Sequence, residues 1–185
     1  MKHAWVVVLF VWTLLVACVA RDVAGAPADY GAARAATLAD AELTLPAMLT
    51  CALQDEYMAH DEYRAILKEF GSLRPFSNIS QTEERHHIVC LVSLFKKHGV
   101  ALPSDRGIEV VRTHETLAAA IQAGVAAEEA NTEMYEHFLT RGLPADVQSV
   151  FEYLLGASRN HLRAFQGVCS GGLGRGCGRG CTSQP

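Results

Sequence analysis

The segment TEERHH, residues 82–87, contains two overlapping Glu-x-x-His pairs, which are Glu83 with His86 and Glu84 with His87. Residues three apart share one face of a helix, so either pair could present a carboxylate and an imidazole together. Such oxygen and nitrogen donors suit iron, manganese or zinc. The surrounding helices must decide which pair faces inward and which other side chains meet it there.

Four segments carry apolar residues at helical steps of three and four, and none shows a convincing strand pattern. Their expected ranges are 46–70, 77–98, 113–140 and 145–166. Short links join the first helix to the second and the third to the fourth, whereas residues 99–112 form a longer connection. The pattern predicts an all-α fold, an antiparallel four-helix bundle with ferritin-like connectivity and a long crossover between helices 2 and 3.

The inward stripe of each expected helix carries a metal-capable side chain at one level of the bundle. These side chains are Glu56, Glu83, His86, Glu128 and His161. Burying an isolated carboxylate costs several kcal/mol unless it is paired or bound to a cation. Their coincidence at one level predicts a metal site, although a single Glu-x-x-His is commonly surface charge and a lone inward His161 is commonly a hydrogen-bonded core residue.

The phase of the second helix favours the first Glu-x-x-His pair. Glu83 and His86 continue the stripe through Ile79 and Cys90, and antiparallel pairing places Glu56 opposite His86. The second pair stays open as an alternative, because it shares the phase of another partly apolar stripe, formed by Ile88, Leu91 and Phe95.

Four stretches resemble an exported branch of the ferritin-like superfamily that is catalogued as a domain of unknown function and is similar to rubrerythrin-type bundles. They are ALQDEYMAHDEY (52–63), RPFSNISQTEERH (74–86), QAGVAAEEANTEMY (122–135) and VFEYLLGASRNHLRAF (150–165). The resemblance implies an iron cofactor and oxidation of Fe(II) by oxygen or peroxide. It places the metal ligands on Glu56, Glu83, His86, Glu128 and His161, with supporting roles for His60, Tyr63 and Tyr135.

One position departs from the full di-iron pattern, which has Glu-x-x-His on two helices. Ser158 stands three residues before His161, where the second Glu is expected. Asn131 and Asp61 are candidates to compensate. Otherwise the site holds one metal, holds two weakly, or is vestigial.

The chain ends differ in composition from the expected bundle, residues 46–166. Lys2 and His3 precede the apolar run Ala4–Ala20, which predicts a signal peptide over residues 1–20. Residues 15–18 also resemble a bacterial lipobox, in which Cys18 would be lipidated and anchor the chain to a membrane. Residues 21–45 read as a linker and 167–185 as a flexible Gly/Cys tail. We expect an exported protein, either periplasmic, secreted or a membrane-anchored lipoprotein.

Two cysteines fall at equal height on the first two expected helices. Cys51 and Cys90 could form a disulfide or remain two buried thiols, because facing helices usually lie farther apart than the bond allows. The dispersed net charge of -4 gives no reason to expect a nucleic-acid partner.

Two functions remain for the expected bundle. The first is an exported metalloprotein that uses oxygen or peroxide. The second is a metal-free exported bundle that acts as an envelope or interaction module. The oligomeric state stays open between a monomer and a homodimer.

Overall fold

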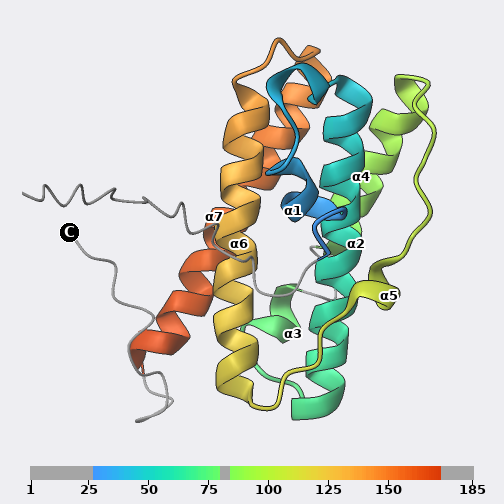
Figure 1. Ribbon diagram of the computed structural model, residues 1–185. Coiled ribbons are helices and arrows are strands. Elements are labelled where there is room, and N and C mark those ends of the chain that lie inside the picture. Colours follow the sequence, from blue (N-terminus) through green and yellow to red (C-terminus); the bar gives the residue numbers. More distant parts are fainter. Residues whose placement is uncertain (1–26, 80–83, 172–185) are drawn as a thin grey trace, which may run out of the picture.

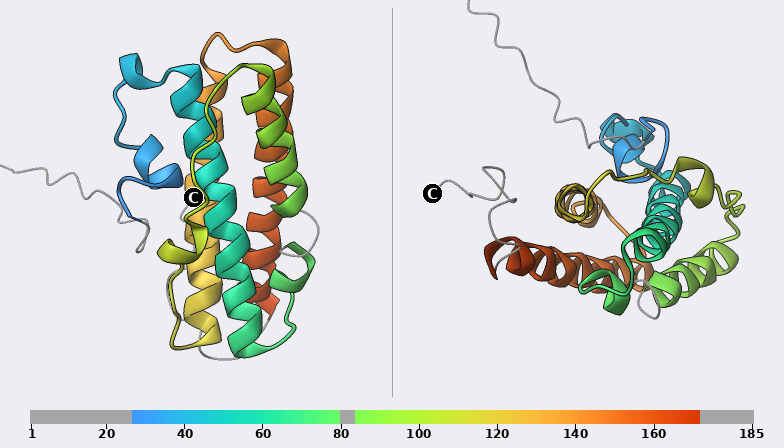
Figure 2. Two further views of the ribbon diagram at one scale, coloured as in Figure 1. Left: turned by 90° about the vertical axis from the view of Figure 1, so that its right-hand side faces the viewer. Right: turned by 90° about the horizontal axis from the view of Figure 1, so that it is seen from below.

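The computed structural model describes residues 27–79 and 84–171, and these residues are helical with no strand among them. The long helices are α2 (Leu45–Phe70), α4 (Glu84–Lys97), α6 (Leu117–Leu139) and α7 (Ala145–Gly171). They run roughly lengthwise through the molecule, and the C-terminal part of α7 leans away from α6 (Figures 1 and 2). The all-α prediction is confirmed. No helix in the described ranges is long and apolar enough to cross a membrane.

The helix ends follow the capping rules. The Thr44 hydroxyl accepts a hydrogen bond from the Ala47 N–H at the start of α2, and Gly71 follows its last residue with a φ of 85°. Thr116 caps α6 in the same way through the Ala119 N–H. The third helix therefore begins four residues later than its expected start at residue 113, while α7 continues five residues beyond its expected end.

The second expected helix is represented by α3 (Phe76–Asn78) and α4 (Glu84–Lys97), which flank residues 80–83, a stretch outside the described ranges. The connection from α4 to α6 runs the length of the molecule and contains the short helix α5 (Gly107–Val110) (Figure 1). Helix α5 packs against α2.

The segment that composition indicated as a linker includes folded structure. Helix α1 (Gly31–Ala35) and a 3-10 turn (Asp40–Glu42) lie beside α2 (Figure 2). Tyr30 and Leu43 are buried, and the Ala32 N–H donates to Asp55 Oδ1 over 2.9 Å. Residues from Tyr30 onward therefore belong to the folded domain. The predicted signal peptide, with Cys18, lies outside the described residues, as does the Gly/Cys tail beyond residue 171.

Two apolar clusters form the core at different levels of the long helices. One gathers Leu53, Leu91, Phe138 and Phe151, among others, and the other gathers Tyr63, Phe76, Ile121 and Phe165. On α2, α6 and α7 the residues between these levels include buried polar side chains. The fold therefore holds a polar layer between two apolar ones.

Candidate metal centre

The polar layer brings together three carboxylates and two imidazoles from all four long helices. They are Glu56 from α2, Glu84 and His87 from α4, Glu128 from α6 and His161 from α7. Each of these side chains is at most 4% exposed. Three of the five, Glu56, Glu128 and His161, are residues that the sequence analysis predicted to meet.

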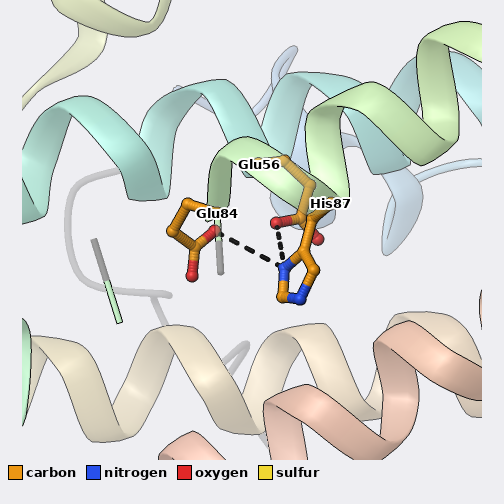
Figure 3. Close-up of side chains that lie close together, drawn as sticks. All are labelled: Glu56, Glu84 and His87. Atoms are coloured by element: carbon orange, nitrogen blue, oxygen red, sulfur yellow. Dashed lines mark hydrogen bonds and ion pairs between the residues drawn. The ribbon is translucent and has the colours of Figure 1, made fainter. Parts of the chain in front are cut away.

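The helix α4 register differs from the prediction. His86 is exposed, and Glu83 lies outside the described residues, whereas Glu84 and His87 point into the layer (Figure 3). The inward orientation predicted for His86 is wrong. Phase was counted from Ile79, on the other side of residues 80–83 from α4, and it does not match the inward face of α4. Within α4 itself, Leu91 at four residues from His87 gives the correct face.

His87 lies between two carboxylates. Its Nδ1 atom is 3.1 Å from Glu56 Oε2 and 3.8 Å from Glu84 Oε2. Ligand atoms of these three residues all lie within 4.8 Å of one another, which is close enough to share one cation (Figure 3).

Glu84 also approaches the second histidine. His161 Nδ1 lies 3.8 Å from Glu84 Oε1 and 3.2 Å from Glu128 Oε1. The two imidazole rings are stacked with centroids 6.0 Å apart. Glu84 therefore lies between two halves of the polar layer. One half contains Glu56 and His87, and the other contains Glu128 and His161.

Burial and mutual charge set the protonation of the first half. Burial alone raises the pKa of Glu56, but His87, with smaller effects of Glu84 and Tyr135, outweighs it and the net shift is downward. Burial alone lowers the pKa of His87, but Glu56 and Glu84 outweigh it and raise that pKa to about 11. Burial and the Glu56 charge hold the pKa of Glu84 well above its ordinary value. These directions favour a charged Glu56–His87 pair and the neutral form of Glu84 beside it.

The predicted supporting residues divide into two sets. Tyr63 donates to Glu128 Oε1 over 2.8 Å, and Tyr135 donates to Glu56 Oε1 over 3.0 Å. Asn131 is buried and lowers the pKa of Asp55 through a side-chain hydrogen bond. His60 is instead paired with Asp61 over 3.2 Å, and both side chains are partly buried.

Asp55 is a buried acid that the sequence analysis missed. Burial, together with the charges of Glu56 and Glu128, raises its pKa to about 7 against the opposing hydrogen bonds of the Ala32 N–H and Asn131. Its place next to Glu56 in the sequence gave no signal, because the contact that holds it comes from α1.

Of the two alternatives for Cys51 and Cys90, the structure shows free thiols, with Cys51 buried and Cys90 half-buried. Cys90 lies one turn from the exposed His86, and its Sγ atom is 3.6 Å from His86 Nε2. The expected burial of Cys90 was therefore only partly correct, because Cys90 was placed on the same inward face as His86.

Comparison with known proteins places the fold but not the function. The sequence matches no protein-family model and no curated protein. A crystal structure of a hypothetical protein from Methanococcus jannaschii is similar, with a TM-score of 0.59 and 22% sequence identity. The match covers 69% of this chain and 79% of that one. At this identity the similarity concerns the fold alone.

Proposed function

We propose that the chain is an exported ferritin-like protein that binds iron between four antiparallel helices, with the crossover between α4 and α6. The observation that carries this proposal is the meeting of Glu84 with both His87 and His161 in the dry interior. Evolution rarely retains buried carboxylates without a charged partner, because their desolvation is costly. Manganese and zinc suit the same donors.

Two carboxylate oxygens of the layer lack hydrogen-bond partners within the described residues, as ligands of a cation would. Glu84 Oε2 and Glu128 Oε2 are buried and have no hydrogen-bond partner among the described residues. Such atoms normally find a partner, and a missing ion is one reason for an exception. Three carboxylates and two imidazoles also match the oxygen and nitrogen donors of non-haem iron sites.

The chain's own residues would orient the ligands and manage protons. Tyr135 and Tyr63 each donate to one oxygen of a carboxylate, which leaves the other oxygen available to bind a cation. His87 must release its Nδ1 proton and Glu84 its carboxyl proton before they can bind. Iron, when bound, supplies one-electron chemistry toward oxygen or peroxide, with Fe(II) as the substrate to be oxidised.

Ser158 limits the second half of the site. Its side chain is buried at the position where the resemblance expects a carboxylate, so Glu128 and His161 have no second acidic ligand from α7. We infer that the Glu56, Glu84 and His87 half binds metal more tightly than the other.

Metal analysis tests the proposal directly. Protein purified without chelators, or reconstituted anaerobically with Fe(II), should contain about one tightly held ion per chain, measured by plasma mass spectrometry. Glu84→Gln should lose this ion, because it removes a ligand to both halves. Arg85→Ala, which changes an exposed neighbour, should retain it.

The metal-free alternative rests on the internal pairing of Glu56 with His87, which already compensates two of the charges. If reconstituted protein holds no iron, manganese or zinc and Glu84→Gln only raises stability, the envelope or interaction module is the correct function. Location would be tested separately by fractionating cells and determining the N-terminus of the mature chain.

A further inference from the structure

The outer face of α4 carries a second group of metal-binding side chains, apart from the buried layer. His86 and Cys90 are four residues apart and project from the same side of the helix. His86 Nε2 lies 3.6 Å from Cys90 Sγ. Since His87 faces the interior, this pair cannot share an ion with the buried site.

The separation of these two atoms matches tetrahedral zinc. Zinc binds thiolate sulfur at about 2.3 Å and imidazole nitrogen at about 2.0–2.1 Å, so two such ligands at a tetrahedral angle lie roughly 3.5–3.6 Å apart. The observed distance therefore lies in the range that a tetrahedral zinc ion requires, and binding also needs loss of the thiol proton.

One chain supplies only half of a closed zinc site. Structural zinc sites hold four protein ligands, and Cys₂His₂ is among the common sets. A second copy related by a two-fold axis brings the same two residues to the same point. Two thiolates, two neutral imidazoles and one zinc ion then sum to zero charge, which suits burial between two surfaces.

The surface around the pair is suited to a second copy. Val89, between His86 and Cys90 in the sequence, is 64% exposed, and Tyr153 from α7 is 47% exposed. The Tyr153 ring meets the His86 ring edge-on with centroids 5.9 Å apart. Exposed apolar and aromatic side chains of this kind characterise the centres of protein interfaces.

We propose that His86 and Cys90 of two chains bind one zinc ion and join α4 helices across a homodimer. The proposal does not depend on the buried layer, because it uses neither Glu84 nor His87. It also identifies zinc as the ion for this face, since thiolate with imidazole is a softer donor set than the carboxylate-rich interior.

Cobalt spectroscopy distinguishes the two sites, because only Cys90 would add thiolate-to-cobalt charge-transfer absorption. The test uses reduced full-length chain with Cys18, Cys169, Cys177 and Cys181 replaced by Ser, which leaves buried Cys51 and Cys90. Co(II) should give the near-ultraviolet band at one thiolate-bound ion per two chains, and zinc should displace it. Sedimentation should show a dimer with zinc and a monomer with chelator.

Variants make the assignment specific. Cys90→Ser should abolish the band and the zinc-dependent dimer, and His86→Ala should lose the dimer. His137→Ala, at an exposed histidine of α6, should change neither, and Glu84→Gln should leave the band intact. No band in the parent, a dimer unchanged in His86→Ala, or one thiolate-bound ion per monomer would each overturn the proposal.

Discussion

Tyr63 and Tyr135 occupy reciprocal positions around the polar layer. Each follows an acidic residue of its own helix by seven positions, and each donates its hydroxyl to the acid on the other helix. Tyr63 of α2 thus holds Glu128 of α6, while Tyr135 of α6 holds Glu56 of α2. The two helices are cross-linked at the level of the site, and both carboxylates are fixed in orientation.

This reciprocity predicts similar effects of removing either hydroxyl. Tyr63→Phe and Tyr135→Phe should each fold and lose about 1 kcal/mol of unfolding free energy, because one buried hydrogen bond is lost. Each should weaken metal binding roughly 10–100-fold, as is usual when a residue that orients a ligand is removed. Urea denaturation and metal titration measure the two effects. Tyr57→Phe, on the same helix but half-buried, is the control, and equal metal affinity in all three variants would contradict the orienting role.

The ion pair between Glu56 and His87 predicts a pH dependence of the metal-free protein. The pKa of His87 is raised from about 6.5 to about 11, so its contribution is fully present below pH 6.5 and is lost as pH rises through 11. Unfolding free energy should therefore fall between pH 7 and 9, with His87 contributing at most about 1.4 kcal/mol per pH unit to the slope. Urea denaturation with chelator present measures this slope.

The control for that slope removes both members of the pair. Glu56→Gln combined with His87→Gln should show a flatter dependence over the same pH range, because neither replacement titrates. Metal should also bind the parent more tightly as pH rises and release protons, which calorimetry in two buffers detects. A parent and double variant with parallel pH profiles would show that His87 is not held protonated.

Local sequence signals predicted most of the long helices and much of the centre. The expected range 46–70 matches α2 to within one residue, and the periodic stripes placed Glu56, Glu128 and His161 inside. These residues lie in long uninterrupted helices, where a 3.6-residue period carries over many turns.

The errors arose where phase was carried over from another element or where contacts come from distant segments. The phase of Ile79 was extended to α4, so His86 was predicted inside and His87 was only the alternative. The burial of Asp55 depends on α1, twenty-three residues earlier, and no local period reports such a contact. Composition likewise indicated a linker where Tyr30 and Leu43 complete the core.

The contact between α1 and α2 gives a prediction at Gly31. Its φ is +58°, and an added Cβ would lie 2.6 Å from Asp55 Oδ1. Gly31→Ala should therefore lower unfolding free energy by about 1–3 kcal/mol, through backbone strain and displacement of the buried carboxyl. Gly156→Ala is the opposite control, because its Cβ meets nothing within 4 Å and alanine favours a helix interior by about 1 kcal/mol. Thermal unfolding of both variants should move in opposite directions.

The packing of α6 on α7 gives a further prediction at Gly124. A Cβ at this position would lie 2.8 Å from the Phe165 ring, which is fully buried. Gly124→Ala should cost roughly 1–3 kcal/mol despite the higher helix propensity of alanine, because overpacking outweighs that gain. A Gly124→Ala protein as stable as Gly156→Ala would show that Phe165 moves aside freely.

The connection from α4 to α6 contacts α2 through the buried carboxylate of Glu62. Glu62 is 4% exposed and accepts hydrogen bonds from Arg112 at 3.0 Å and 3.3 Å, while His114 Nε2 lies 2.9 Å from its other oxygen. Removing one partner of a buried ion pair leaves the other charge uncompensated, which typically costs about 3–5 kcal/mol. Arg112→Ala should lower the unfolding free energy by about 3 kcal/mol, because His114 remains to compensate Glu62.

Arg106 offers a matched comparison on the same connection. Its guanidinium pairs with Glu109 over 2.8 Å, but both side chains are about half exposed or more. Exposed pairs contribute about 0–1 kcal/mol, so Arg106→Ala should leave the urea midpoint nearly unchanged. Equal losses of unfolding free energy in Arg106→Ala and Arg112→Ala would contradict a specific stabilising role of the Glu62 pair. A Glu62→Gln change in the Arg112→Ala background should restore part of the loss, because the neutral amide no longer requires a buried cation.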